Sequence, residues 1–243
     1  MDEEGIVLNE RPCDYYYVTP GHQVPTGVTM SSARRRQLLE HAARHDAVII
    51  EDDYDSESNF TLNPLPALKA SDRSGRVVYV SSLSKALSPG LRLGFMVADP
   101  DLIDEARALR RLVYRHPPTN IQYQMAHFLA QGHYETHLRR YHYDSAQRWE
   151  RLHAALQRYL PSCRALAGSE HANAFWLQTP AQINTQQLTW RAAHAGVLIE
   201  PGARHFLNAA PPDNYFRMGF HAINPDAIAQ GVEVLRGQLE QMG

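Results

Sequence analysis

The chain contains little of what marks a secreted, redox-active or zinc-binding protein. Its 243 residues include only two cysteines, Cys13 and Cys163, which lie far apart and lack any C-x-x-C spacing. Neither a zinc site nor a redox motif is indicated, so we expect two reduced structural thiols.

Long apolar runs and an excess of positive charge are also missing. No apolar run approaches the roughly 20 residues that a bilayer span needs, and the N-terminal "MDEEGIVLNE" is acidic where a signal peptide would be basic. A net charge of -2 gives no general attraction to nucleic acid. The longest basic run, Arg34-Arg35-Arg36, begins a helical pattern, and we interpret it as a solvated helix face. We therefore expect a soluble, cytoplasmic protein that binds neither a membrane nor, through this chain, nucleic acid.

Histidine is plentiful, but its pattern does not predict a metal site. Two pairs have the i, i+4 spacing of one helix face, His41 with His45 and His133 with His137. The second pair, in "HYETH", lacks the Glu of H-E-x-x-H, and no third ligand is placed nearby with any specificity. We expect no bound metal.

Lysine is scarce, because Lys69 and Lys85 are the only two lysines among 24 basic residues. The base composition of a genome can impose such a bias, which is no signal in itself. Lys85 nevertheless stands among serines and glycines in "SSLSKALSPGLRLGF" (81–95), directly after a β-branched run. A lysine at this place in an arginine-rich chain calls for a chemical reason.

The first half of the chain alternates between strand and helix patterns. A helical pattern after a serine N-cap occupies 32–46, and short runs typical of strands occupy 15–19, 47–51, 76–82 and 93–99. This alternation favours an α/β fold with a mostly parallel sheet.

The second half is helical at first and then mixed. Helical patterns run from 99 to 160, broken by "HPPTN" and Gly132. Strand patterns follow at 173–179, 197–201 and 215–220, with helical stretches at 184–195 and 225–241. We predict three parts: a large-domain segment at 1–115, linking helices at 116–160, and a smaller α+β domain at 161–243.

Five acidic residues cluster in "IIEDDYDSE" (49–57), at the end of a predicted buried strand. The carboxyl ends of strands in an open α/β sheet line the ligand crevice, where carboxylates need a partner. That partner could be a divalent metal or a protonated heterocyclic nitrogen. An acidic loop in water is the simpler interpretation.

Lys85 follows the next predicted strand, so its amine should emerge at the same sheet edge as Asp52. A lysine that is neutral can form a Schiff base with an aldehyde. Ser82 and Ser84 supply hydroxyl groups, and Arg92 follows across an "SPG" turn that folds the chain back. Hydroxyls and a guanidinium together suit a dianionic phosphate.

An aldehyde-reactive lysine, a phosphate site and a carboxylate for a pyridinium nitrogen are the three requirements of pyridoxal 5′-phosphate. The joint occurrence of "PTG", "EDDYDSE", "SLSK…PGLRLG" and a terminal "RMGF" resembles the fold type I aminotransferase-like (class I/II) domain of MocR-type regulators, a branch of the GntR family. The resemblance runs from about residue 6 to the end. It implies a pyridoxal phosphate cofactor held as an internal aldimine and an amino acid or amine as ligand.

The resemblance also implies roles for individual residues. Lys85 would be the catalytic Schiff-base lysine, Asp52 the partner of the pyridine nitrogen, and Tyr54 the donor to the phenolic oxygen. Ser82, Ser84 and Arg92 would hold the phosphate. In the second half, Arg217 would clamp the substrate α-carboxylate, although an exposed strand arginine is the plain alternative. Members of the family are commonly homodimers, and we expect the same here.

Two departures from the family pattern matter. Val24 stands where most aminotransferases of this class have Asn before "PTG", which resembles the regulators more than the dedicated enzymes; by analogy the Val24-Pro25 bond is expected to be cis. The family's glycine-rich phosphate turn and its ring-stacking aromatic have no counterpart. We therefore expect a partial large domain, whose four strands are neighbours with one edge unpaired, and a reading frame that is truncated or starts late.

Three functions remain open. The first is the effector-sensing domain of a MocR-type transcriptional regulator, lacking its DNA-binding domain here. The second is a working class I/II aminotransferase, in which Lys85 also moves a proton in amino-group transfer to a 2-oxo acid. The third is a fragment that binds no cofactor. The motifs are common to the first two, so the sequence does not decide whether the chain is an enzyme.

Overall fold

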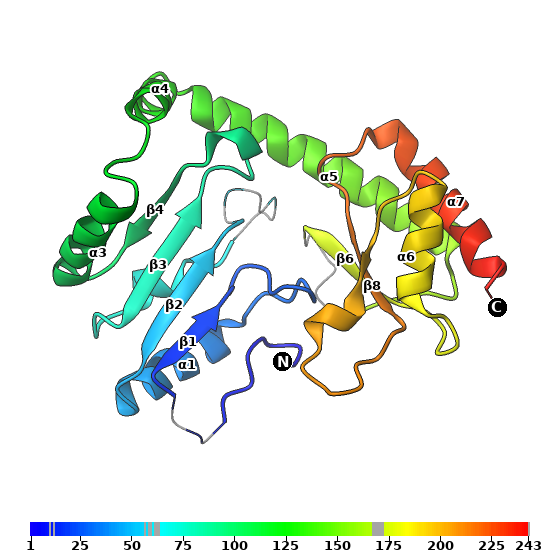
Figure 1. Cartoon of the computed structure of the whole chain (residues 1–243), viewed down its shortest axis with the longest axis horizontal. Coiled ribbons are helices and arrows are strands. Elements are labelled where there is room, and N and C mark those ends of the chain that lie inside the picture. Colours follow the sequence, from blue (N-terminus) through cyan, green and yellow to red (C-terminus); the bar gives the residue numbers. More distant parts are fainter. Residues whose placement is uncertain are drawn as a thin grey trace. The chain divides into compact units, whose positions relative to one another are not determined.

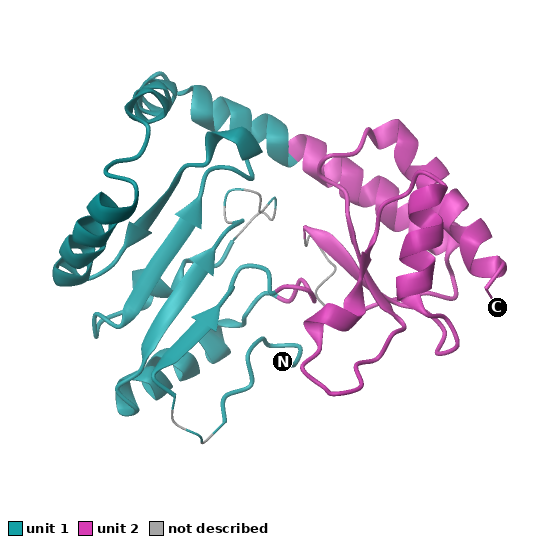
Figure 2. Cartoon of the chain, viewed as in Figure 1, with its two compact units in different colours: residues 1–23, 29–142 teal, residues 24–28, 143–243 magenta. Residues whose placement is uncertain are grey.

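The computed structural model describes residues 1–9, 11, 13–55, 57, 60, 64–166 and 173–242. These residues form two compact units, shown in Figure 2. Unit 1 comprises residues 1–23 and 29–142, and unit 2 comprises residues 24–28 and 143–243. Each unit contains its own four-stranded sheet.

The sheet of unit 1 has the strand order β1-β2-β3-β4 (Figure 1). Its strands are β1 (Tyr15–Val18), β2 (Val48–Asp53), β3 (Val77–Ser82) and β4 (Gly94–Val97). The first three are parallel, and β4 runs antiparallel to β3. The predicted α/β class and the neighbouring placement of the four strands are therefore confirmed. Because β1, β2 and β3 are parallel, the loops that follow them leave from one edge.

The pleat of this sheet sorts its side chains onto two faces. Tyr16, Ile49 and Val77 are register partners across the three parallel strands, and all three are buried. They pack in one core with Leu38 and Ala42 of helix α1 (Ser32–Arg44), which follows the serine N-cap expected from the sequence. Residues one position further along each strand point to the other face.

Helices form most of the rest of unit 1. A short helix, α2 (Leu68–Ser71), precedes β3, and α3 (Pro100–Val113) and α4 (Thr119–Ala130) follow β4. The long helix α5 (His133–Tyr159) contributes its first ten residues to unit 1 and the remainder to unit 2. The breaks expected at "HPPTN" and Gly132 separate α3 from α4 and α4 from α5.

Unit 2 is an α+β unit with an antiparallel sheet of order β5-β6-β8-β7. Its strands are β5 (Arg164–Ala165), β6 (Ala174–Gln178), β7 (Glu200–Pro201) and β8 (Tyr215–Gly219), and its further helices are α6 (Thr185–His194) and α7 (Ile228–Glu240). Phe175 and Phe216 from the sheet and Leu188 and Leu235 from the helices are fully buried. Of these elements, only the two-residue strand β5 had no counterpart among the sequence predictions.

The basic run at the start of α1 is not a solvated face, and that interpretation was wrong for two of its three residues. Arg35 is buried, and its guanidinium donates to the carbonyl oxygens of Pro20 (2.9 Å), Met30 (2.9 Å) and Pro66 (2.8 Å). Arg34 forms ion pairs with acidic residues near the N-terminus. Helical spacing alone does not reveal that carbonyl groups from distant loops compensate for the burial of a charge.

Arg35 therefore should contribute strongly to the stability of unit 1. Burial lowers its pKa, and replacing it with alanine would remove the guanidinium donor from three carbonyl oxygens, of which that of Pro20 keeps the Met30 amide as a donor. We expect Arg35→Ala to reduce the free energy of unfolding by about 3 kcal/mol, as measured by urea denaturation. The exposed neighbour Arg36 is the matched control, and Arg36→Ala should cost about 0.5 kcal/mol or less. Equal losses in the two variants would show that the three contacts contribute nothing.

Among the described residues, no helix is both long and apolar enough to cross a membrane.

Candidate functional site

The loops that follow β1, β2 and β3 meet at the carboxyl edge of the unit 1 sheet. The Nζ atom of Lys85, in the loop after β3, lies 3.4 Å from Oδ2 of Asp55 and 4.6 Å from the centre of the Tyr54 ring. Tyr54 and Asp55 come directly after β2. The sequence placed the Lys85 amine at the same edge as Asp52; the observed contacts bring it to Asp55 and Tyr54, which follow Asp52 in the same acidic segment.

Asp52 lies inside β2 and not beyond it, because this strand extends two residues further than the predicted 47–51. Its carboxylate accepts a hydrogen bond from the hydroxyl of Tyr17 on the neighbouring strand β1. That bond, together with burial, raises the pKa of Tyr17 to about 12. Tyr17 is the register partner of Ile50, two residues before Asp52, so the side chains of Tyr17 and Asp52 lie on the same face of the sheet. The strand pattern in "YYYVT" alone did not predict this contact.

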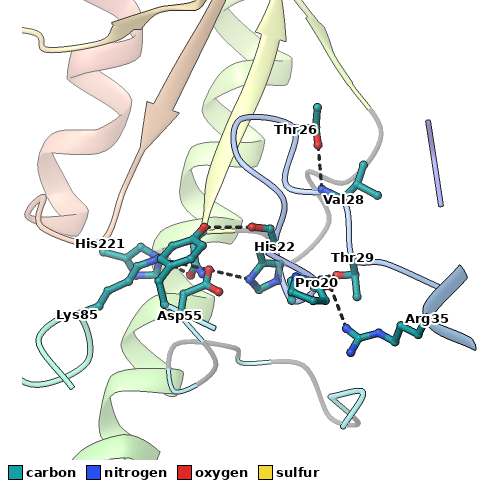
Figure 3. Close-up of polar contacts among 12 residues, drawn as sticks. Pro20, His22, Thr26, Val28, Thr29, Arg35, Asp55, Lys85 and His221 are labelled. Carbon is teal, nitrogen blue, oxygen red and sulfur yellow. Dashed lines mark hydrogen bonds and ion pairs between the residues drawn. The ribbon is translucent and has the colours of Figure 1, made fainter. Parts of the chain in front are cut away.

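Asp55 and His22 form a buried pair that the sequence interpretation did not single out (Figure 3). Nδ1 of His22 lies 2.9 Å from Oδ2 of Asp55, and the two side chains are 4% and 1% exposed. The hydroxyl of Tyr54 donates to the backbone oxygen of His22, at 3.2 Å. The only signal for this pair in the sequence was that "GHQ" and "EDDYD" both follow predicted parallel strands.

The expected turn after Lys85 is present. The amide of Leu83 donates to the carbonyl of Leu93 (3.0 Å), so the chain folds back on itself through a 3-10 turn at Pro89–Leu91. Gly94 is required at the start of β4, because a Cβ there would lie 2.6 Å from the carbonyl oxygen of Ser81. This fold-back brings the residues next to Ser82 and Ser84 close to those next to Arg92.

The predicted phosphate ligands lie at the two ends of this fold-back, and the Ser82 hydroxyl has a local partner. The hydroxyl oxygen of Ser82 accepts from the amide of Ser84, at 3.2 Å. Arg92 ends the 3-10 turn in the left-handed conformation, with φ of 48°.

The Val24-Pro25 peptide bond is cis, as the family analogy predicted.

Two histidines of α5 hold the loops that carry Lys85 and Asp55. Nε2 of His137 lies 2.7 Å from the carbonyl oxygen of Ala86, and Nε2 of His142 lies 2.8 Å from that of Glu57. Since a carbonyl oxygen only accepts, each Nε2 carries the hydrogen. The described residues include no group of three His, Cys, Asp or Glu side chains that could hold a metal ion.

Arg217 lies on β8 in unit 2, where a carboxylate already faces it. It is the register partner of Glu200 on β7, and its guanidinium lies 3.3 Å from Oε2 of that residue. Glu200 also approaches His205 (3.4 Å) and Arg204 (3.6 Å) through its other oxygen. The Arg217 side chain is 24% exposed, so part of the guanidinium remains accessible.

The chain is similar to aminotransferases and to transcriptional regulators. The family model described as aminotransferase class I and II matches residues 18–235. The chain is 38% identical over 236 residues to the HTH-type transcriptional regulator TauR of Rhodobacter capsulatus, covering 96% of this chain and 48% of that protein. It is 34% identical over 221 residues to the probable rhizopine catabolism regulatory protein MocR of Rhizobium meliloti, covering 90% and 44%.

Solved structures agree on the fold. The crystal structure of Pyrococcus horikoshii kynurenine aminotransferase, in complex with PMP, matches with a TM-score of 0.85 and 28% identity, over 94% of this chain and 56% of that one. The chain thus spans about half the length of the proteins that it matches.

Proposed function

The chain belongs to the class I and II aminotransferase family, and we propose that it is the effector-sensing part of a MocR-type transcriptional regulator, binding pyridoxal 5′-phosphate and an amino acid or amine. Pyridoxal phosphate is the cofactor implied by the family and by the aminotransferase structures that the chain matches. The observation that carries the proposal is the position of Lys85, at the edge of a parallel sheet beside Tyr54 and one strand away from Asp52.

The donor set at this edge fits the cofactor. When bound, pyridoxal phosphate supplies an aldehyde that bonds to an amine and a pyridinium ring that withdraws electrons. Lys85 would provide the amine. Asp52 would keep the ring nitrogen protonated, and the Tyr54 hydroxyl would donate to the ring oxygen in place of the His22 carbonyl that it contacts here.

The phosphate would be held by the fold-back after β3. Ser82 and Ser84 provide hydroxyl groups and Arg92 a guanidinium, which can bind two phosphate oxygens at once. The Leu83 to Leu93 hydrogen bond keeps the two ends of this segment together.

Arg217 would bind the carboxylate of an amino acid in competition with Glu200. We expect Arg217→Ala to weaken amino-acid binding to the cofactor-loaded protein about 30-fold, because a partly buried charged hydrogen bond contributes about 2 kcal/mol. Isothermal titration should show no such loss for an amine that has no carboxylate. If both ligands weaken equally, Arg217 supports the structure of unit 2 and does not recognise a carboxylate.

A working aminotransferase is the second candidate, favoured by 28% identity and a TM-score of 0.85 to a solved aminotransferase, over 94% of this chain and 56% of that one. The regulator is preferred because identity to the two regulators is higher. Multiple-turnover transfer of an amino group to a 2-oxo acid distinguishes the two. A sensor should stop after at most one transfer per site, whereas sustained turnover would establish the enzyme.

A further inference from the structure

One corner of unit 1 joins three ionisable side chains from three successive loops. His22 follows β1, Asp55 follows β2 and Lys85 follows β3 (Figure 3). A single oxygen, Oδ2 of Asp55, lies 2.9 Å from Nδ1 of His22 and 3.4 Å from Nζ of Lys85. The proposed reactive amine of Lys85 therefore contacts Asp55, which in turn contacts the buried His22.

The exposed fraction of these three side chains increases from Asp55 through His22 to Lys85. The side chain of Asp55 is 1% exposed and that of His22 is 4% exposed, while Lys85 is 28% exposed. A carboxylate at such depth is costly unless charged or hydrogen-bonding partners compensate for its lost hydration. Among the described residues, His22 and the amine of Lys85 both lie within reach of the Asp55 carboxylate.

Further contacts also fix the positions of these three loops. The Tyr54 ring lies under the Lys85 amine, and the Tyr54 hydroxyl donates to the His22 carbonyl, so the same three loops are linked a second time. On the helix side, His137 contacts the carbonyl of Ala86, the residue after Lys85. The position of the amine relative to Asp55 is thus determined by several independent contacts.

We propose that Asp55, supported by His22, is the positioning residue of Lys85, and that it holds the amine as an ammonium until an aldehyde arrives. Its importance for function rests on the proposed function above, but the ion pair itself needs no cofactor. An ammonium has no lone pair, so Lys85 must release one proton and leave Asp55 before it can bond to a carbonyl carbon. Asp55 would thereby lower the reactivity of the free amine and keep it in place.

Other ionisable groups act on this corner and must be considered. The carboxylate of Asp53 accepts from the Tyr79 hydroxyl (2.8 Å) and, like that of Asp55, approaches Gly21. His137 and Tyr54 face the same loops. Asp53 is the carboxylate among these groups and lies two residues before Asp55, which makes it the matched control.

The two-lysine composition makes the proposal directly measurable. Trace acylation with acetic anhydride, without cofactor, gives the relative reactivities of Lys85 and Lys69 from peptide masses, and Lys69 serves as the internal reference. A carboxylate at this distance lowers the neutral fraction of an amine by a factor of ten or more. We expect Asp55→Asn to raise the Lys85 to Lys69 reactivity ratio about tenfold at pH 8, with Asp55→Glu remaining near wild type.

Two results would overturn the proposal. One is an unchanged Lys85 to Lys69 ratio in Asp55→Asn. The other is an equal rise in Asp53→Asn, which would mean that any carboxylate at this sheet edge lowers the reactivity of the Lys85 amine. Circular dichroism checks folding, and Asp55→Ser replaces Asp55→Asn if the latter does not fold. Because no cofactor is present, a raised ratio supports the ion pair even if pyridoxal phosphate never binds, and in that case only the proposed function fails.

Discussion

Replacing Lys85 with arginine is expected to abolish covalent attachment of pyridoxal phosphate. Arginine keeps the positive charge beside Asp55 and Tyr54, but its guanidinium stays protonated and does not bond to an aldehyde under physiological conditions. Wild-type protein mixed with the cofactor and then desalted should retain the visible absorbance of the lysine-bound form. Lys85→Arg should lose that absorbance down to background.

Lys69 offers the matched control for this experiment. Its amine lies 3.3 Å from Oδ2 of Asp72 and 2.7 Å from the carbonyl of Val77, so it has an ion pair comparable with that of Lys85. It lies in α2 and not in a loop at the carboxyl edge of the sheet. Lys69→Arg should therefore retain full absorbance, and an equal loss in both variants would mean that attachment is not specific to Lys85.

The second large effect is expected at Asp52. If its carboxylate pairs with the protonated ring nitrogen, Asp52→Asn removes the charge and keeps the shape. We expect pyridoxal phosphate affinity, measured by fluorescence titration, to fall about 100-fold, which corresponds to about 2.7 kcal/mol.

Tyr17 provides the control that separates charge from local structure. Its hydroxyl contacts the same carboxylate, so Tyr17→Phe removes a hydrogen bond to Asp52 without removing the negative charge. A loss of about 1 kcal/mol, or about fivefold in affinity, is expected. If Tyr17→Phe costs as much as Asp52→Asn, the role of Asp52 is to organise the β1–β2 pair and not to hold the cofactor.

Much of the fold could be predicted from the sequence, because its elements have strong local patterns. β-branched runs and an N-capped helix located β1, α1, β2 and β3, and parallel order followed from their alternation. The end of β2 was placed two residues too early, since Asp52 and Asp53 have low strand propensity of their own. It extends because Asp52 and Asp53 pair with Val80 and Ser81 of β3, which is a tertiary effect.

The candidate site was predictable only in part. Lys85 was singled out by its position after a strand, and Asp52 and Tyr54 by the acidic cluster and a family motif; their roles stay predictions. The contacts of Asp55 with His22, and of Arg217 with Glu200, join residues 33 and 17 positions apart, and no local pattern encodes such pairs. Arg35 was misinterpreted for the same reason, because the carbonyl groups that compensate for its burial come from three separate segments.

The central claim is that Lys85 is the residue that bonds to pyridoxal phosphate, and one measurement tests it most directly. The wild-type protein is incubated with the cofactor, reduced with borohydride and digested, and the modified residue is identified by tandem mass spectrometry. The account predicts a single phosphopyridoxyl group on Lys85 and an unmodified Lys69. Modification of Lys69 to the same extent, or of neither lysine, would contradict it.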